Sequence, residues 1–315
     1  MTAAFVFPGQ GSQFIGMGKD LNEAFPDARE VFQEVDDALS QNLSALMFDG
    51  EEADLNLTEN TQPALMAVSM AVVNVLKKQG GIALEDTCAY VAGHSLGEYA
   101  ALTAAGTIAL SDTARLLKLR GQSMQRAVPV GVGSMAAVLG LEFDAVAEIA
   151  KAAAHSEVCT AANDNSDGQV VVSGHKEAVE RAVALASERG ARKAVVLPVS
   201  APFHCMLMSP AAEAMEPALA DTQFNKPIVP VVTNVTAQAE DNPERLKELL
   251  VEQITGMVRW RESVLYMRDQ GVDQMVELGA GKVLSGLARR IDRSVKCESV
   301  GTPEQVEALI EKLKG

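Results

Sequence analysis

The sequence predicts an α/β protein that combines a core around a mainly parallel sheet with an inserted ferredoxin-like (βαββαβ) subdomain. The chain opens with a short apolar strand and a glycine-rich loop, which is the usual start of an α/β sheet. Strand-like and helix-like segments alternate afterwards, and residues 134–199 change to the order βαββαβ. The apolar share of 48% in 315 residues is ample for a buried core.

The core begins with the strand in "AAFVF" (3–7). A long helix is expected over residues 58–81, because Thr61 can cap it, Pro63 suits its first turn and two glycines stop it. Further expected core elements are a strand at 87–93, a helix at 95–106, a strand at 227–235, a helix at 243–254, a strand at 272–279 and a helix at 282–291.

The inserted segment has a different order of strands and helices. Its expected elements are a strand at 134–140, a helix at 143–155, strands at 158–163 and 169–174, a helix at 176–190 and a strand at 193–199. That order is the split unit of a ferredoxin-like domain. We therefore divide the chain into a core of residues 1–130 and 199–315 and a ferredoxin-like subdomain of residues 131–198.

Composition and charge exclude several classes of function. A formal net charge of −15 argues against a nucleic-acid or membrane-surface binder, since both need a basic face. Four scattered cysteines form no C-x-x-C pair, so neither a metal site nor a disulfide is expected, and a reducing compartment fits. The N-terminus lacks the basic region of a signal peptide, and the most apolar helix is too short to span a bilayer. We expect a cytoplasmic protein.

The segment "GHSLG" (93–97) has the G-x-S-x-G form of a nucleophile elbow. In such an elbow a serine sits on a sharp turn between a strand and a helix, and both elements are expected here. Ser95 is therefore the candidate nucleophile. By itself, this pattern favours a serine hydrolase.

A serine nucleophile needs a base, and the chain contains four histidines. His94 adjoins Ser95 on the turn, so its side chain is expected to point away from the hydroxyl. His155 and His175 lie at expected helix ends, where solvation or capping explains them. His204 lies in a proline-fixed loop where the chain re-enters the core, and such loops often carry catalytic groups. No acidic residue between Ser95 and His204 stands in an obvious post-strand position, so a dyad is the prediction.

A helical interpretation of residues 111–127 places Arg120 on an apolar stripe. A charge on a buried face must be paired, either by an internal carboxylate or by the carboxylate or phosphate of a ligand. A planar guanidinium is the group that grips a carboxylate through two parallel hydrogen bonds. The sequence leaves open whether Arg120 binds a ligand, joins an internal ion pair or reaches the surface.

Five segments together resemble one family over almost the whole chain. They are "FVFPGQGSQ", "GHSLGEYAAL", "LRGQSMQ", "LPVSAPFH" and "VELGAGKVLSGL". The family is the malonyl-CoA:acyl carrier protein transacylases of bacterial type II fatty acid synthesis. The resemblance implies a hydrolase-like α/β core with an inserted ferredoxin-like subdomain. Two loops depart from the family pattern, with Asp167 and Ala280 where proline is common.

The resemblance implies a role for each matching residue. Ser95 would become malonylated, and His204 would act as its general base and acid. The backbone N–H groups of Gln10 and Leu96 would form the oxyanion hole, and the backbone carbonyl of Gln253 would orient the histidine.

The same resemblance implies how the substrate is held. Arg120 would grip the free carboxylate of the malonyl group, and Asn163 and Met124 would line the substrate cleft. Phe203 fits members that take malonyl rather than methylmalonyl units, since its ring would crowd a substituent on the α-carbon. No metal or redox cofactor is implied.

The expected reaction is ping-pong transfer of a malonyl group from malonyl-CoA to the phosphopantetheine thiol of acyl carrier protein, supplying fatty acid elongation. Candidate docking patches for this acidic, transient partner are the basic runs 287–296 and 191–193, and a monomer is expected. The alternatives are an acyltransferase of a polyketide pathway, a serine esterase or thioesterase, and an inactive module that binds CoA or a carrier protein. An esterase would not need Arg120.

Overall fold

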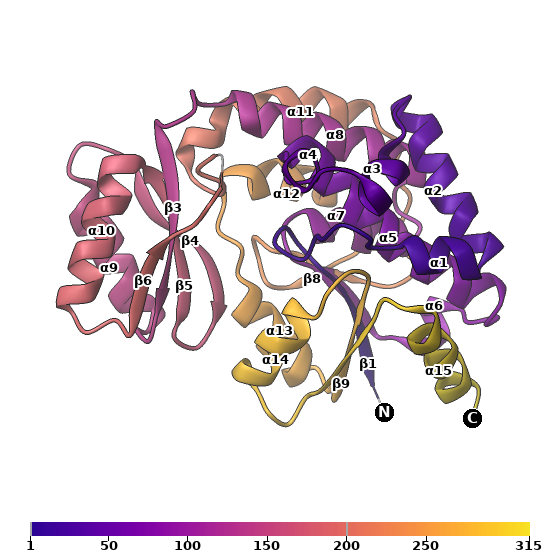
Figure 1. The fold of residues 1–315 in the computed structure, drawn as a ribbon. Helices are drawn as coiled ribbons and strands as arrows, with labels where there is room; N and C mark the ends of the chain where they lie inside the picture. The colour runs from indigo at the N-terminus through magenta and orange to yellow at the C-terminus, as the bar shows by residue number, and fades with distance from the viewer. Residues whose placement is uncertain (1, 200) are drawn as a thin grey trace.

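The computed structural model describes residues 2–199 and 201–315, which form two sheets and their covering helices (Figure 1). The larger sheet has the strand order β10–β9–β1–β2–β7–β8, and its neighbours run parallel except for β7 and β8. Its strands are β1 (Ala3–Phe7), β2 (Tyr90–Gly93), β7 (Val231–Val232), β8 (Ala239–Glu240), β9 (Gln274–Leu278) and β10 (Lys296–Val300). The predicted mainly parallel core sheet is confirmed.

Helices cover both faces of this sheet, because alternate side chains of a strand point to opposite faces. Phe5 and Phe7 of β1 pack with one group of helices, and Ala4 and Val6 pack with the other. The first group contains α2 (Pro26–Leu39), α5 (Thr58–Lys78), α7 (Leu96–Ala104) and α8 (Leu110–Arg126). The second contains α13 (Trp260–Asp269) and α14 (Val283–Ile291).

Shorter and peripheral helices complete the larger part of the molecule. They are α1 (Lys19–Ala24), α3 (Leu43–Asp49), α4 (Glu52–Leu55), α6 (Leu84–Thr87), the 3-10 helix η1 (Met206–Met208), α11 (Ser209–Asp221), α12 (Pro243–Thr255) and α15 (Pro303–Lys314). Among these, α11 packs on α8 and α12, and α15 packs on α5 and β10.

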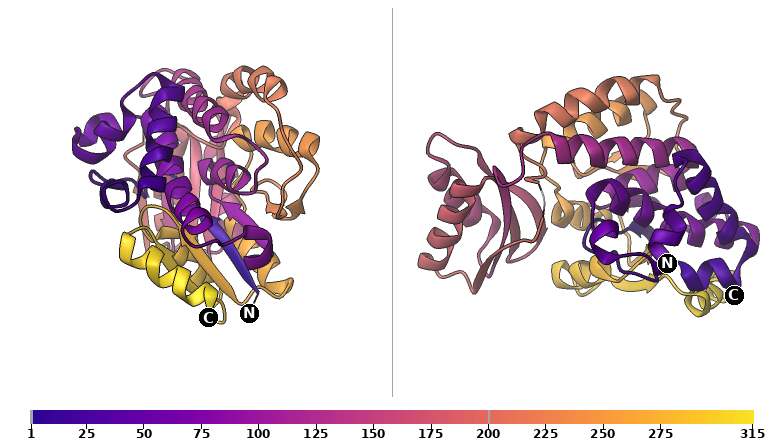
Figure 2. Two further views of the ribbon diagram at one scale, coloured as in Figure 1. Left: turned by 90° about the vertical axis from the view of Figure 1, so that its right-hand side faces the viewer. Right: turned by 45° about the horizontal axis from the view of Figure 1, so that its top comes forward.

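The smaller sheet has the order β4–β5–β3–β6 and is antiparallel throughout. Its unit runs β3 (Gly133–Leu139), α9 (Phe143–Ala154), β4 (Cys159–Ser166), β5 (Gln169–His175), α10 (Lys176–Glu188) and β6 (Lys193–Val196), which is the expected βαββαβ order. Figure 2 shows this sheet set apart from the larger one, with α9 and α10 on its outer face. Ala136 and Val138 pack under these helices, whereas Met135 and Val171 pack towards the core.

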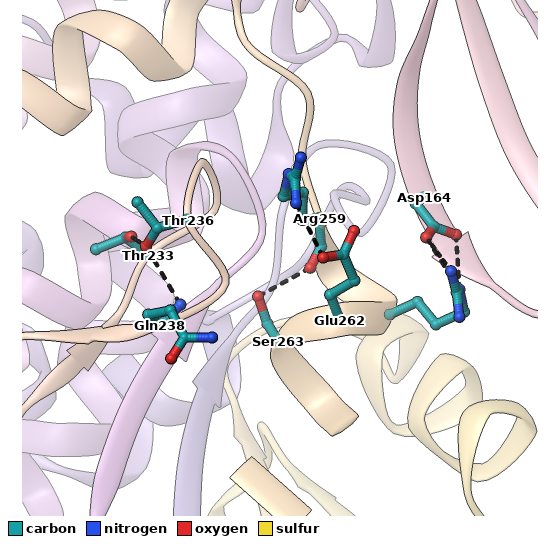
Figure 3. Close-up of polar contacts among 8 residues, drawn as sticks. Asp164, Thr233, Thr236, Gln238, Arg259, Glu262 and Ser263 are labelled. Atoms are coloured by element: carbon teal, nitrogen blue, oxygen red, sulfur yellow. Dashed lines mark hydrogen bonds and ion pairs between the residues drawn. The ribbon is translucent and has the colours of Figure 1, made fainter. Parts of the chain in front are cut away.

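The edge strand β4 ties the two parts together. The backbone N–H of Asp164 donates to the carbonyl of Val258 at 3.0 Å, and the N–H of Val258 donates to that of Ala162 at 2.9 Å. The buried carboxylate of Asp164 also accepts from Arg261 Nε at 2.9 and 3.1 Å (Figure 3). A buried charge needs such a partner, so this ion pair holds β4 against α13.

Two core elements differ from the sequence predictions. Of the strand expected over 227–235, only β7 pairs within the sheet, because two prolines remove backbone donors from the segment before it. The helix expected over 58–81 begins at Thr58 as predicted, but Thr61 does not cap it, since the Thr61 hydroxyl donates to the carbonyl of Leu55 at 2.6 Å. Pro63 therefore lies inside the helix, beyond its first turn.

Candidate active site

Ser95 lies on the sharp turn between β2 and α7, at the carboxyl end of the parallel strands. Its backbone has φ 54° and ψ −109°, a costly conformation for a residue other than glycine. The turn is this tight because α7 begins close to the end of β1, where a Cβ on Gly97 would strike the carbonyl of Phe7. The strand–turn–helix context of a nucleophile elbow is therefore present.

His204 lies beside this serine, with its Nε2 atom 2.8 Å from Ser95 Oγ. Its Nδ1 atom lies 2.9 Å from the backbone oxygen of Gln253 and 3.1 Å from that of Gly256. Both carbonyls belong to the C-terminal end of α12, where backbone oxygens lack partners within the helix. Because a carbonyl only accepts, Nδ1 carries the proton, and Nε2 presents its lone pair to the serine hydroxyl.

The protonation of His204 follows from its surroundings. Burial, followed by the charge of Arg120, lowers the pKa of His204 to about 3, although the two backbone carbonyls act in the opposite direction. The imidazole is therefore neutral at physiological pH. A neutral imidazole is the form that can accept a proton from a hydroxyl group.

Arg120 reaches the same serine from α8, and only 1% of the residue is exposed. Its Nη2 atom donates to Ser95 Oγ at 3.1 Å and to Gln253 Oε1 at 2.8 Å, and its Nη1 atom donates to Gln62 Oε1 at 2.9 Å. Its hydrogen-bond partners among the described residues are all neutral. A buried cation with only neutral partners can receive the carboxylate of a ligand.

A cavity of about 180 Å³ opens beside Ser95. It is small next to the ~300–1,000 Å³ of sites for drug-sized ligands, so it fits a short acyl group. Every site residue predicted from the sequence lines it except Gln253, and these are Gln10, Ser95, Leu96, Arg120, Met124, Asn163, Phe203 and His204. Gln253 does not line the cavity and is fully buried.

The backbone donors expected to bind an oxyanion lie on two neighbouring strand ends. Leu96 is the first residue of α7, where backbone N–H groups have no partner within the helix and carry partial positive charge. Gln10 lies in the loop after β1, which pairs with β2. Both residues line the cavity next to Ser95.

The small sheet closes the other side of the cavity. Asn163 and Asn165 of β4 lie on this wall, together with the apolar side chains of Met135, Val171 and Leu197. Asn165 Oδ1 lies 2.8 Å from a ring nitrogen of the histidine next to Ser95. That histidine, His94, therefore faces the small sheet, as expected for a side chain directed away from the serine hydroxyl.

Sequence reasoning missed several residues that hold this site. Asn234 accepts from the backbone N–H of Ser95 at 2.7 Å, in a turn that the bonded hydroxyls of Thr233 and Thr236 shape (Figure 3). Glu98 is buried beneath the serine and bonds to Asn234 and Gln253. One signal was available, since Glu98 is the only charged residue between Ser95 and Ser111.

No group of three or more His, Cys, Asp or Glu side chains in residues 2–199 and 201–315 is arranged to hold a metal ion.

Comparisons with known proteins agree with this geometry. The profile of the acyl transferase domain family matches residues 4–314. The chain is 46% identical over 308 residues to the malonyl CoA-acyl carrier protein transacylase of Escherichia coli K12, covering 98% of each chain. It superposes on an acyl-carrier-protein-S-malonyltransferase from Bartonella henselae with a TM-score of 0.98 at 56% identity, covering 100% of both chains.

A third relative is a malonyl-transacylase solved in complex with a type II PKS acyl-carrier protein. It superposes with a TM-score of 0.95 at 42% identity, covering 99% of this chain and 100% of that chain. An elbow serine with a histidine and a buried arginine, on a parallel sheet with a ferredoxin-like insertion, defines an acyl transferase. The chain belongs, more narrowly, to the malonyl CoA-acyl carrier protein transacylase family.

Proposed function

We propose that the protein moves a malonyl group from malonyl-CoA to the phosphopantetheine thiol of an acyl carrier protein, through a malonyl ester of Ser95. The position of Arg120 carries the proposal, because this buried guanidinium donates to Ser95 Oγ at 3.1 Å. A carboxylate bound to Arg120 lies close to an acyl carbon that the serine attacks. The site therefore suits a short acyl group with a free carboxylate, as the names of the relatives also suggest.

In the first half-reaction, Ser95 Oγ gives its proton to His204 Nε2 and attacks the thioester carbonyl. The carbon–sulfur bond then breaks, and the leaving CoA sulfur takes the proton from His204. The negative oxygen of the intermediate faces the backbone N–H groups of Leu96 and Gln10. Losing one such donor costs ~3–4 kcal/mol of transition-state stabilisation.

The second half-reaction reverses these roles. The carrier thiol gives its proton to His204 and attacks the malonyl ester, and the C–O bond to Ser95 breaks as the serine recovers its proton. Arg120 holds the acyl chain by its far end, so only a long, flexible thiol arm reaches the ester carbonyl in line. Water competes poorly in a small cavity from which the bound acyl group displaces it.

The most direct test is the intact mass of the protein after mixing with malonyl-CoA. A malonyl adduct that maps to the Ser95 peptide is expected, and acyl carrier protein should remove it. The Ser95→Ala variant is the control and should carry no adduct. The proposal fails if wild-type protein acquires no adduct under any condition.

A second candidate is an acyltransferase that serves a polyketide pathway. The malonyl-transacylase that was solved with a type II PKS acyl-carrier protein favours it, since the chain matches that protein over nearly its whole length. The chemistry at Ser95 would be the same, and only the carrier protein would differ. Transfer rates to purified fatty acid and polyketide carrier proteins distinguish the two functions.

The cellular compartment and the oligomeric state of the protein stay predictions. No helix among residues 2–199 and 201–315 is long and apolar enough to cross a membrane. We expect a cytoplasmic monomer, with the basic runs 287–296 and 191–193 available to the acidic carrier protein. Light scattering of the purified protein checks the monomer.

A further inference from the structure

Two side-chain amides hold the backbone of Ser95 from both sides. Asn234 Oδ1 accepts from the Ser95 N–H at 2.7 Å, and Gln253 Nε2 donates to the Ser95 carbonyl at 3.1 Å. The serine needs this support because its positive φ is energetically costly. The orientation of the candidate nucleophile therefore depends on where these two amides lie.

Both amide-bearing residues are anchored on a single oxygen atom. Glu98 Oε2 accepts from the backbone N–H of Asn234 at 2.9 Å and from Gln253 Nε2 at 2.9 Å. Glu98 lies on α7, three residues after Ser95, and is 1% exposed. Its other oxygen, Oε1, has no hydrogen-bond partner among the described residues. The side-chain hydrogen bonds of Glu98 thus go to the two residues that hold the serine.

Gln253 extends this anchor to the rest of the site. Its Nε2 faces Glu98, so its Oε1 faces Arg120 Nη2 at 2.8 Å, and its backbone oxygen accepts from His204 Nδ1. A carboxylate only accepts and a guanidinium only donates, so the two ends determine which way the amide points. A shift of Glu98 would therefore move Gln253, and with it the partners of both the base and the guanidinium.

The amide also separates Arg120 from Glu98, whose pKa burial raises to about 7. A direct ion pair between Glu98 and Arg120 would occupy the donors that a substrate carboxylate needs. With Gln253 between them, the guanidinium keeps neutral direct partners, and the carboxylate still lies on the far side of the amide. The arrangement secures Arg120 through neutral acceptors and leaves its Nε without a hydrogen-bond partner among the described residues.

We propose that Glu98 is a positioning residue for acyl transfer. The two hydrogen bonds that its Oε2 accepts hold Asn234 and Gln253 in place. Through these residues they orient Ser95, His204 and Arg120. The hydrogen bonds of Glu98 carry this role, and its charge does not. The identity of the transferred group rests on the proposed function.

A pair of near-isosteric variants separates contacts from charge. Glu98→Gln removes the charge, but its amide oxygen still accepts two hydrogen bonds. Glu98→Asp keeps the charge and withdraws the oxygens by about 1.5 Å, one carbon–carbon bond. We expect kcat for malonyl transfer to stay within about threefold in Glu98→Gln and to fall at least about twentyfold in Glu98→Asp, since a 1 Å misplacement can cost ~100-fold.

Two further measurements distinguish a positioning role of Glu98 from a general loss of folding. The preference for malonyl-CoA over acetyl-CoA should fall in Glu98→Asp, because Arg120 loses its fixed partner. Phenylmethanesulfonyl fluoride, a neutral reagent, forms a bond between its sulfur and Ser95 Oγ while fluoride leaves and His204 takes the proton. Its labelling rate should also fall in Glu98→Asp, with cooperative thermal unfolding retained.

Glu277 provides the matched control. It lies on β9, is equally buried and also accepts two hydrogen bonds, here both from backbone N–H groups, those of Leu284 at 3.0 Å and Ser285 at 2.8 Å. These donors belong to the first turn of α14, and Glu277 does not line the cavity. We expect Glu277→Asp and Glu277→Gln to change thermal stability without changing the malonyl preference or the labelling rate.

Three results would overturn the proposal. They are Glu98→Asp as active as wild type, Glu98→Gln as impaired as Glu98→Asp, and lower activity with an unchanged malonyl preference. If Glu98→Asp does not fold, Gln253→Ala replaces it, since it keeps the backbone carbonyl but loses the amide, and an unchanged preference again overturns the proposal. If wild-type protein forms no malonyl adduct, the proposed function fails, whereas sulfonyl fluoride labelling of Ser95 still decides the role of Glu98.

Discussion

The two walls of the cavity differ in kind. The large-sheet wall carries a nucleophile candidate, a neutral imidazole and a guanidinium, namely Ser95, His204 and Arg120. The small-sheet wall carries two neutral amides and apolar side chains, with Asn165 bonded across to His94. One wall can make and break bonds, and the other can only shape the space and orient what enters it.

This difference has a structural origin. Ser95 lies between the end of β2 and the start of α7, and His204 bonds to backbone carbonyls at the end of α12, where backbone groups lack partners within the helix. Arg120 reaches them from the middle of α8. The small sheet lines the cavity with residues of strands that pair with each other, among them Asn163 and Asn165 of β4 and Val171 of β5. Substitutions on the first wall should therefore change the chemical step by orders of magnitude. Substitutions on the second should change acyl selectivity by small factors.

The largest effect is expected for Ser95→Ala, which should lower malonyl transfer at least about 10⁴-fold, because the covalent route is lost. His204→Ala should come close to this loss. The double variant should be no worse than Ser95→Ala, since the two residues act as a unit. Steady-state transfer assays measure all three. Losses that multiply in the double variant would contradict the proposed dyad.

Arg120→Ala should lower malonyl transfer about 100-fold and acetyl transfer only a few fold, because a charged hydrogen-bond pair contributes ~3 kcal/mol. Arg120→Lys should restore little, since a lysine cannot form two parallel bonds to a carboxylate. Parallel assays with the two acyl-CoA substrates measure the ratio. Equal losses for both substrates would make Arg120 a structural residue.

The pH dependence of serine labelling tests the environment of His204. Its pKa of about 3 lies below the ordinary 6.5, so the protonated, inactive form should appear only in acid. Labelling by phenylmethanesulfonyl fluoride should therefore vary less than about threefold between pH 5 and 8. In Arg120→Gln the fall of the labelling rate in acid should occur at higher pH, because the arginine charge that lowers the pKa of His204 is gone. A wild-type midpoint near pH 6.5 would contradict this account.

Phe203 lies where the large-sheet part meets the cavity and is 8% exposed. Phe203→Ala should raise methylmalonyl transfer relative to malonyl transfer about tenfold, since one methyl group in a tight pocket contributes ~1–3 kcal/mol to selectivity. Competition between the two CoA esters measures this ratio. An unchanged ratio would mean that another side chain limits the α-carbon.

The smallest effect is expected on the small-sheet wall. Asn165→Ala removes the hydrogen bond to His94, worth about 1 kcal/mol, and should raise KM for malonyl-CoA about fivefold with kcat nearly unchanged. Full kinetic curves separate the two constants. A loss confined to kcat would show that the small-sheet wall takes part in the chemical step.

Much of the fold could be predicted because its signals are local. The order of strands and helices gave the insertion, and the G-x-S-x-G pattern gave the elbow. The strand predicted over residues 227–235 was too long, since only β7 forms there. Apolar residues between prolines resemble a strand, but each proline lacks the backbone N–H that would pair with a neighbouring strand. The capping role of Thr61 was also wrong, because Thr61 lies inside α5 and its hydroxyl bonds to the carbonyl of Leu55 instead of capping the helix.

The site was predictable where a residue carries its own signal. Arg120 stands out as a charge on an apolar stripe, and it is buried as that stripe requires. Glu98 and Asn234 act by holding other residues, and these two bonded residues lie 136 positions apart in the chain. No periodicity or motif reports a contact of that kind, so it appears only once the strand ends are brought together.

The fate of the isolated malonyl-protein tests the central claim most directly. Protein labelled with radioactive malonyl-CoA, freed of CoA and then divided, is mixed with acyl carrier protein or with buffer alone. We predict that the label reaches the carrier thiol at least about 100-fold faster than it is lost to water, because Arg120 and the small cavity favour the thiol arm. Loss to buffer as fast as transfer to the carrier would make Ser95 the nucleophile of a hydrolase.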